Sequence, residues 1–331
     1  MLTKKQNLLE TIHGGHPDRY VNMFEAFRIV KDSPYFANNA APVKGGPNVV
    51  NSWGVELAFP ANTPGAFPVH KPADKIVIKD VTHWRDYLKV PQVKYPESAW
   101  EPYIKMVEEI DREELFVTPM IYPGLFEQTH YLMEIQECLI NFYEEPEAMH
   151  EIIDCLTEWE MAYVEELCIH YHPDAFFHHD DWGSQVSTFL SPEMFEEFYY
   201  PAYKQIYGYL KSHGVQVIVH HSDSYAATLV PMMIDMGIDI WQGVMNTNNI
   251  PALIEKYGGQ ITFMGGVDSA SVDFPGWTAE DIARETAKTC KNCGTKFFIP
   301  CTSQGGPMST FPGVYQAVTE EIDKQSKIYF K

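Results

Sequence analysis

The second half of the chain alternates between short apolar runs and longer stretches in which apolar residues recur at helical spacing. One helical stretch spans residues 192–212, where Ser191 and Pro192 provide a cap followed by a proline at the helix start, and another runs from Thr278 to Gly294. Alternation of strand and helix is typical of a parallel sheet with crossover helices. The apolar runs, each expected to form a strand, are 115–121, 175–179, 215–220, 237–242, 261–265 and 296–300.

The first half of the chain is less regular. The opening residues 1–15 have the pattern of an amphipathic helix, and strands are expected at 21–26 and near 49–58. A proline- and glycine-rich segment at 59–72 is too broken to be core, and a long loop of this kind is often a lid or a binding loop. Because no repeat or linker separates these parts, we expect a single domain over residues 1–331.

Composition excludes several classes of function. The chain has 331 residues, 45% hydrophobic and 21% charged, and a formal net charge of −21 that would repel nucleic acid. It contains no run of 18 apolar residues and no apolar signal segment, so we expect no membrane association. Its six cysteines fall inside helix and strand patterns, which suits a reducing, cytoplasmic location better than a disulfide framework.

Polar residues cluster where the expected strands end. The run 178–182 (HHDDW) follows one strand and 220–223 (HHSD) follows the next. In a barrel of parallel strands these ends surround one mouth, which predicts an active site there. Because side chains alternate along a strand, one of His220 and His221 should face the barrel axis and the other outward. A histidine beside an apolar run can also be a hydrogen-bonded core residue, and this alternative stays open for His178 and His220.

Three of these residues offer a metal-ligand set. His221, Asp223 and Cys301 supply a nitrogen, a carboxylate and a thiolate, and three protein ligands with an open position describe a catalytic zinc site. We expect Asp181 to join or orient this set. Cys290 and Cys293 also have metal-like spacing, but they lack a second cysteine pair and are expected to be structural.

Five segments resemble the uroporphyrinogen-decarboxylase superfamily, which implies a (β/α)₈ TIM barrel, an α/β fold with its active site at the carboxyl ends of the strands. The likeness spans nearly the whole chain. The segments are KKQNLLETIHGGHPDRYV (4–21), LSPEMFEEFYYPAYKQI (190–206), VIVHHSDSYAATLVPMMIDMGIDIWQ (217–242), ITFMGGVD (261–268) and FIPCTSQGGPMSTFPGVYQAV (298–318).

The resemblance separates two branches of the superfamily. True decarboxylases carry an arginine-rich stretch after the first strand, whereas residues 23–32 (MFEAFRIVKD) contain Arg28 alone, with Glu25 nearby. A porphyrinogen with many carboxylates needs several fixed cations, so decarboxylation is the weaker alternative. The cobalamin-dependent methyltransferases bind zinc through a His-x-Cys motif and a distant cysteine. His221 and Cys301 match two of these positions, and Asp223 replaces the first cysteine.

That replacement favours oxygen chemistry. A carboxylate in place of a thiolate makes the ligand set harder and the metal a stronger Lewis acid toward an ether oxygen. The chain is similar to the first methyltransferase of anaerobic O-demethylase systems, which moves a methyl group from a methoxylated aromatic to the Co(I) centre of a separate corrinoid protein. Zinc-dependent methylation of a thiol is the first alternative, and a barrel that only binds a ligand is another.

The remaining site predictions complete this hypothesis. The sequence has no cobalamin-binding Asp-x-His-x-x-Gly element, so the corrinoid is expected on a partner protein. Aromatic residues near strand ends are expected to hold the arene, with core packing as the alternative. The predicted catalytic residues are His179, Asp180 and Asp181, and the predicted substrate-binding residues are Tyr122, Phe126, Trp182 and Trp241.

Overall fold

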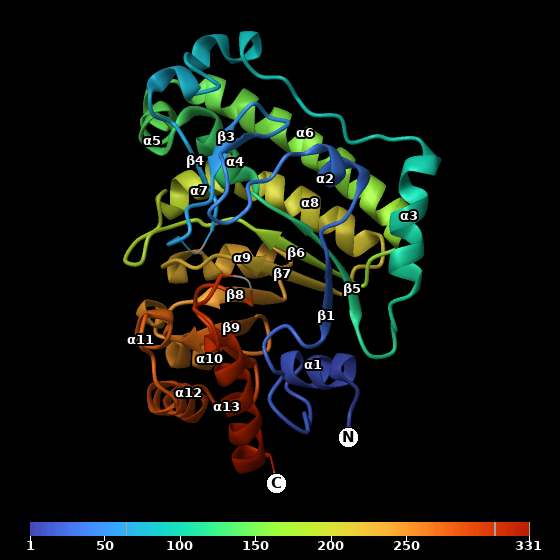
Figure 1. Ribbon diagram of the computed structural model, residues 1–331, viewed down its shortest axis with the longest axis vertical. Coiled ribbons are helices and arrows are strands. Elements are labelled where there is room, and N and C mark those ends of the chain that lie inside the picture. The colour runs from blue at the N-terminus through green and yellow to red at the C-terminus, as the bar shows by residue number, and fades with distance from the viewer. Residues whose placement is uncertain (64, 308, 331) are drawn as a thin grey trace.

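The fold is built on a sheet of parallel strands (Figure 1). The computed structural model describes residues 1–63, 65–307 and 309–330, and within these residues seven strands pair in the order β1-β5-β6-β7-β8-β9-β10. Each of the six apolar runs predicted to be strands overlaps one of them, so those predictions are confirmed. The strands are β1 (Phe27–Val30), β5 (Phe116–Ile121), β6 (Ala175–His179), β7 (Val217–His221), β8 (Ile240–Val244), β9 (Thr262–Val267) and β10 (Phe298–Thr302).

A closed barrel of eight strands is not confirmed. Within the described residues the curled sheet ends at β1 and β10, which do not pair with each other. The predicted strand at 21–26 is wrong, because Met23 has φ of +54°, a left-handed conformation that an extended strand does not contain. The N-terminal segment instead packs against the last strand, since the N–H of Phe297 donates to the carbonyl of Thr11 at 3.1 Å.

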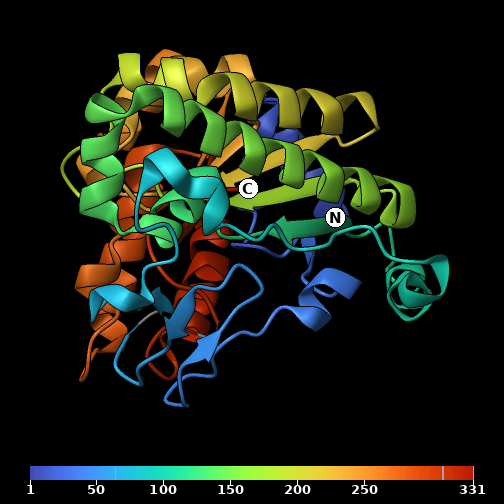
Figure 2. The same cartoon turned by 90° about the horizontal axis from the view of Figure 1, so that it is seen from above.

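A small antiparallel sheet follows β1. The strand expected near 49–58 is divided into β2 (Val49–Val50) and β3 (Glu56–Ala58), and β3 also pairs with β4 (Phe67–Pro68). The predicted loop 59–72 therefore contributes a strand to this sheet, although Pro64 lies outside the described residues. Figure 2 shows this segment, coloured blue, on the side of the molecule away from the long helix α6 (Pro146–Tyr171).

Helices connect the parallel strands. The helix predicted from Thr278 is confirmed as α12 (Ala279–Cys293), with the Thr278 side chain accepting from the N–H of Asp281. The single helix predicted over 192–212 is broken at Tyr199 into α7 (Pro192–Phe198) and α8 (Tyr200–Ser212). The remaining α-helices are α1 (Lys4–Ile12), α2 (Pro34–Asn38), α3 (Glu97–Glu108), α4 (Leu125–Met133), α5 (Ile135–Glu144), α9 (Val230–Met236), α10 (Ile250–Tyr257), α11 (Ser269–Val272) and α13 (Val314–Tyr329), and the 3-10 turns are η1 (Ala73–Lys75), η2 (Val81–Asp86), η3 (Ala227–Leu229) and η4 (Asn246–Asn248). Among the described helices, none is both long enough and apolar enough to span a bilayer.

Side chains of the strands alternate between two buried layers. One layer, here called the inner face, lies inside the curl of the sheet, and the other, the helix face, packs under the surrounding helices. Inner-face residues include Phe177, Val219, Ile240, Met264 and Ile299. Helix-face residues include Phe176, Ile218, Trp241, Phe263 and Phe298. This alternation determines which polar residues can meet at the mouth. The expectation of a single domain over residues 1–331 stays a prediction.

Candidate metal centre

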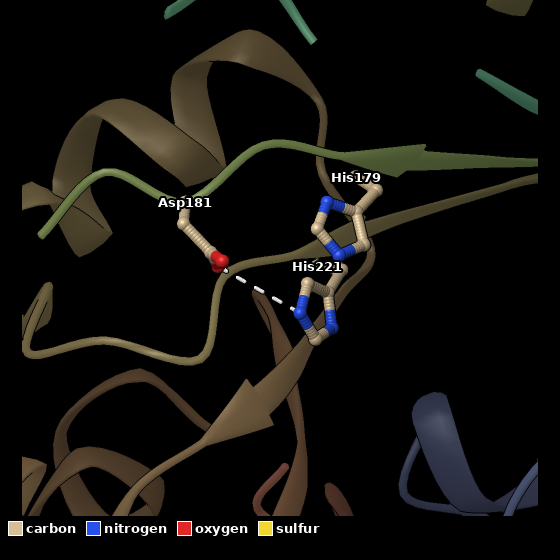
Figure 3. Close-up of side chains that lie close together, drawn as sticks. All are labelled: His179, Asp181 and His221. Carbon is tan, nitrogen blue, oxygen red and sulfur yellow. Dashed lines mark ion pairs between the residues drawn. The ribbon is translucent and has the colours of Figure 1, made fainter. Parts of the chain in front are cut away.

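Two histidines end neighbouring strands side by side on the inner face. His179 and His221 are the last residues of β6 and β7 and are partners in the parallel register. Their rings stack with centroids 4.2 Å apart and planes 22° apart. Asp181 lies two residues beyond β6, and ligand atoms of His179, Asp181 and His221 all fall within 4.8 Å of one another (Figure 3). This group is called the metal triad below.

A second carboxylate borders the metal triad. His221 Nε2 lies 3.7 Å from Asp181 Oδ1 and 3.9 Å from Asp223 Oδ2. The backbone N–H of Asp223 donates to Asp181 Oδ1 at 2.8 Å, which fixes the two acidic residues together. Burial, reinforced by the charge of Asp181, raises the pKa of Asp223 to about 7. Asp181 and Asp223 thus lie close together beside a histidine nitrogen, and a bound cation would stabilise this arrangement.

Hydrogen bonds aim both imidazoles at this site. The side-chain carbonyl of Gln242 accepts from His221 Nδ1, and because a carbonyl cannot donate, the neutral ring keeps its lone pair on Nε2, facing the carboxylates. His179 Nδ1 lies 3.0 Å from Glu127 Oε2 on α4. Burial lowers the pKa of both histidines, which favours the neutral, ligating form. A partner on the second ring nitrogen is the usual way that proteins orient metal-ligating histidines.

Cys301 is more completely buried than any member of the metal triad. Its side chain is fully buried, and burial raises the pKa of the thiol to about 12. Gln242 Nε2 lies 3.9 Å from Cys301 Sγ, so the same amide contacts both His221 and the thiol. The structure therefore places His221 and Cys301 on the same side of the fold, linked through Gln242. The ligand set of His221, Asp223 and Cys301 stays a prediction.

Asp180 has a different environment from its neighbours. Its carboxylate is fully buried and accepts the backbone N–H groups of Phe126 and Glu127 at 3.0 and 2.8 Å, at the first turn of α4. Trp182 Nε1 donates to it at 3.0 Å, and the Tyr203 hydroxyl also donates. Burial raises the pKa of Asp180 to about 6. Of the predicted catalytic residues, His179 and Asp181 thus meet in the metal triad, whereas Asp180 anchors a helix.

Most of the predicted arene-binding residues are enclosed in protein. Trp182 stacks on His220 with centroids 3.8 Å apart, and Trp241 is fully buried with its Nε1 donating to the Ser222 carbonyl at 2.9 Å. Phe126 is 2% exposed. Tyr122 is 36% exposed and is the one of the four predicted rings that presents an open surface within the described residues.

Comparison with known proteins identifies the family. The sequence profile described as "Uroporphyrinogen decarboxylase (URO-D)" matches residues 73–325. The chain belongs to the uroporphyrinogen decarboxylase family. A search of curated protein sequences finds no match.

One solved structure shares the fold of this chain over nearly its whole length. A "methyltransferase from Methanosarcina mazei" is similar to this chain with a TM-score of 0.68 at 16% identity, covering 98% of this chain and 99% of that one. The catalytic domain of a family GH18 chitinase from the fern Peteris ryukyuensis has a TM-score of 0.37 at 12% identity, covering 72% and 82% of the two chains. This second similarity is too low to support an argument.

Three contributors to the site of this URO-D family protein were assigned no role from the sequence. Glu127 lies on α4, and the sequence around it does not distinguish it from the other acidic residues on helices. Nothing local indicates that it faces His179. Gln242 could have been found, since alternation along β8 places it opposite the outward-facing Trp241. Phe177, on the inner face, lies with its ring centroid 6.4 Å from that of His221 and 6.0 Å from that of Phe24.

Proposed function

We propose that this URO-D family protein is a metal-dependent methyltransferase that moves a methyl group from a small methoxylated arene to the Co(I) centre of a separate corrinoid protein. The observation that supports it most directly is the convergence of the metal triad (His179, Asp181 and His221) at the ends of β6 and β7. The similarity in fold to a methyltransferase from Methanosarcina mazei is consistent with this class of reaction.

The donor set suits a divalent cation, with zinc as the proposed ion. Two imidazole nitrogens and a carboxylate leave an open position of the kind found at catalytic zinc sites. Asp223 lies within reach as a further oxygen ligand, and Gln242 and Glu127 hold the imidazoles in the ligating orientation. When bound, such an ion would supply Lewis acidity toward a coordinated oxygen.

The same donor set favours an ether over a thiol as the substrate. The metal triad contains no thiolate, and a hard set of nitrogen and oxygen ligands prefers oxygen donors. Phe24, which packs against the buried ring of Phe177, and the exposed ring of Tyr122 provide apolar surface for an arene. Stacking on a ring contributes about 0.5–1.5 kcal/mol beyond the buried area, which would orient a substrate that has few polar groups.

Transfer of the methyl group breaks its bond to the ether oxygen and forms a bond to cobalt, so the phenolate that remains takes up a proton. The sequence contains no Asp-x-His-x-x-Gly element to hold a corrinoid. The acceptor is therefore proposed to arrive on a partner protein that docks over the mouth, and turnover should depend on the concentration of that partner.

Metal analysis combined with a methyl-transfer assay tests the proposal. Purified protein is loaded with Zn²⁺ and assayed with 2-methoxyphenol and a reduced corrinoid protein. We expect His179→Ala to lose the metal and the activity, while Cys301→Ser keeps the metal because Cys301 lies outside the metal triad. The reverse result would favour the ligand set of His221, Asp223 and Cys301. Failure of the wild type to bind any divalent cation would overturn the metal-dependent reaction, and a higher rate with methanethiol would replace the ether by a thiol.

A further inference from the structure

A tyrosine on the helix face bridges the two histidines that adjoin the metal triad. The Tyr207 hydroxyl, on α8, lies 2.9 Å from His178 Nδ1 and 2.8 Å from His220 Nδ1. All three side chains are fully buried. The prediction that one of His220 and His221 faces outward is thus confirmed, with His220 on the helix face and His221 on the inner face.

The hydrogen bonds through Tyr207 end at the backbone carbonyl of Asp180, which can only accept. This end determines which atom donates in each of the other hydrogen bonds. His220 Nε2 lies 3.2 Å from the Asp180 backbone carbonyl, which can only accept, so Nε2 of His220 carries a proton. In the neutral imidazole the other nitrogen, Nδ1, then accepts from the Tyr207 hydroxyl at 2.8 Å. The Tyr207 oxygen then accepts from His178 Nδ1. The Tyr207 hydroxyl therefore makes one hydrogen bond to β6, through His178, and one to β7, through His220.

His178 has a charged neighbour at its other nitrogen. Its Nε2 lies 3.2 Å from Glu160 Oε1 on α6, an ion-pair contact without the alignment of a hydrogen bond. Both side chains are almost fully buried. The position of His178 is consequently held from two directions, by α6 through Glu160 and by α8 through Tyr207.

On each strand, the histidine that Tyr207 contacts lies one residue before the histidine proposed to bind the metal. The parallel register joins His178 to His220 and His179 to His221. The side chains of each strand point to opposite faces, so Tyr207 contacts neither His179 nor His221 but fixes the backbone that carries them. Beyond His179 and His221 the strands end, and the loops that carry Asp181 and Asp223 begin. Because Tyr207 holds β6 and β7 side by side just before they end, it helps to set the distance between the proposed metal ligands on the two strands.

We infer that Tyr207 is a positioning residue for the metal centre, acting through His178 and His220. The inference rests on the proposed function, because it requires that His179, Asp181 and His221 bind a metal. Without the hydroxyl, two buried imidazoles lose their shared partner, and the ends of β6 and β7 lose one of the restraints that hold them together. Substitution of a residue that supports the metal ligands without contacting the metal commonly changes metal affinity by about 10- to 100-fold.

A matched pair of tyrosine substitutions tests the inference. Tyr207→Phe removes the bridging hydroxyl, and Tyr199→Phe removes an equally buried hydroxyl that has no hydrogen-bond partner within the described residues. The Zn²⁺ dissociation constant of each folded variant is measured by competition with a chromophoric chelator. We expect Tyr207→Phe to weaken binding about 10-fold and Tyr199→Phe to leave it unchanged.

Further outcomes separate this inference from the proposed function. If the wild type binds no divalent metal, the proposed function fails. If the wild type binds metal and folded Tyr207→Phe matches Tyr199→Phe, only the positioning role fails. Should Tyr207→Phe not fold, His178→Gln, which keeps the bond between Tyr207 and His220, replaces it in the comparison. Wild-type affinity in that folded variant would equally overturn the positioning role.

Discussion

Gln242 determines which nitrogen of His221 is available to a ligand. Its side-chain carbonyl accepts from Nδ1, which leaves Nε2 to face Asp181 and Asp223, and its amide nitrogen lies 3.9 Å from the Cys301 sulfur. The residue is 2% exposed, so water cannot replace either contact. At this position a single amide selects the ligating tautomer of the imidazole.

Substitution of Gln242 should therefore weaken metal binding. In Gln242→Leu, His221 loses its acceptor at Nδ1 and can rotate or change tautomer, so we expect the Zn²⁺ dissociation constant to rise about 10- to 100-fold. Isothermal titration calorimetry of the metal-free protein measures this change. Gln260→Leu serves as the control, because Gln260 is exposed and lies just before β9, at the end of the sheet opposite the centre. Equal affinity in both variants would contradict the role assigned to Gln242.

Asp223 should make the metal-free protein sensitive to pH. Its pKa is raised from the ordinary 3.8 to about 7, so between these values the folded state holds a proton that the unfolded state releases. The free energy of unfolding should therefore fall as the pH rises from about 4 to about 7. Because the side chain keeps 26% of its surface exposed, we expect a loss on the order of 1–2 kcal/mol rather than the full shift.

Asp223→Asn should lose less stability over the same range, since the amide does not titrate. Urea unfolding of metal-free wild type and variant at pH 5 and pH 8 gives the comparison. The difference should disappear when Zn²⁺ saturates the wild type, because a bound cation keeps the carboxylate ionised. An identical pH dependence in both metal-free proteins would assign the effect to other carboxylates.

Among the elements, helix α4 is held to the sheet by the loop after β6. Its first turn presents the N–H groups of Phe126 and Glu127 to the Asp180 carboxylate, and Gly124 just before it leaves no room for a side chain. A Cβ on Gly124 would lie 2.5 Å from Asp180 Cβ. This attachment places Glu127 against His179, so the position of α4 determines the orientation of a proposed metal ligand.

Removal of the Asp180 carboxylate should destabilise this attachment. Asp180→Ala removes the acceptor of the buried donors of Phe126, Glu127 and Tyr203, and we expect the free energy of unfolding to fall by about 3–5 kcal/mol. Asp180→Asn keeps one acceptor oxygen and should lose less. Chemical denaturation measures both. If Asp180→Ala were as stable as the wild type, Asp180 would be free for the catalytic role predicted from sequence.

The elements also show how far the sequence could predict the structure. Strands β5 to β10 were predictable because a parallel sheet covered on both faces requires continuous apolar runs. The segment 21–26 has a similar pattern, but the left-handed backbone of Met23 depends on tertiary packing that the pattern does not contain. Alternation along β7 predicted that one of His220 and His221 would face inward, whereas the contact of Glu127 with His179 joins residues 52 positions apart. Such a contact is decided by how α4 packs, which no local spacing encodes.

At the scale of the whole molecule, the segments that follow the carboxyl ends of the strands carry exposed apolar side chains. Val186 lies in the loop after β6 and is 77% exposed, Phe311 lies after β10 and is 43% exposed, and Tyr122 follows β5. In this class of fold these segments surround the active-site mouth. Single exposed apolar residues are common on protein surfaces, but a group of them around a mouth can form a surface that another molecule covers. They are therefore candidates for the contact with the proposed corrinoid protein.

A charge introduced at this rim should impair docking without disturbing the metal centre. Val186→Asp places a carboxylate where an apolar contact is expected, so we predict that the concentration of corrinoid protein needed for half-maximal methyl transfer rises several-fold while Zn²⁺ content stays constant. Ile169→Asp is the matched control, because Ile169 is 53% exposed but lies near the end of α6, before β6, at the opposite end of the sheet. Steady-state rates at increasing corrinoid protein measure the effect. Equal rates for the two variants at every concentration would show that the partner does not dock over the loop after β6, and the rim residues on the other side of the mouth would then be the surface to test.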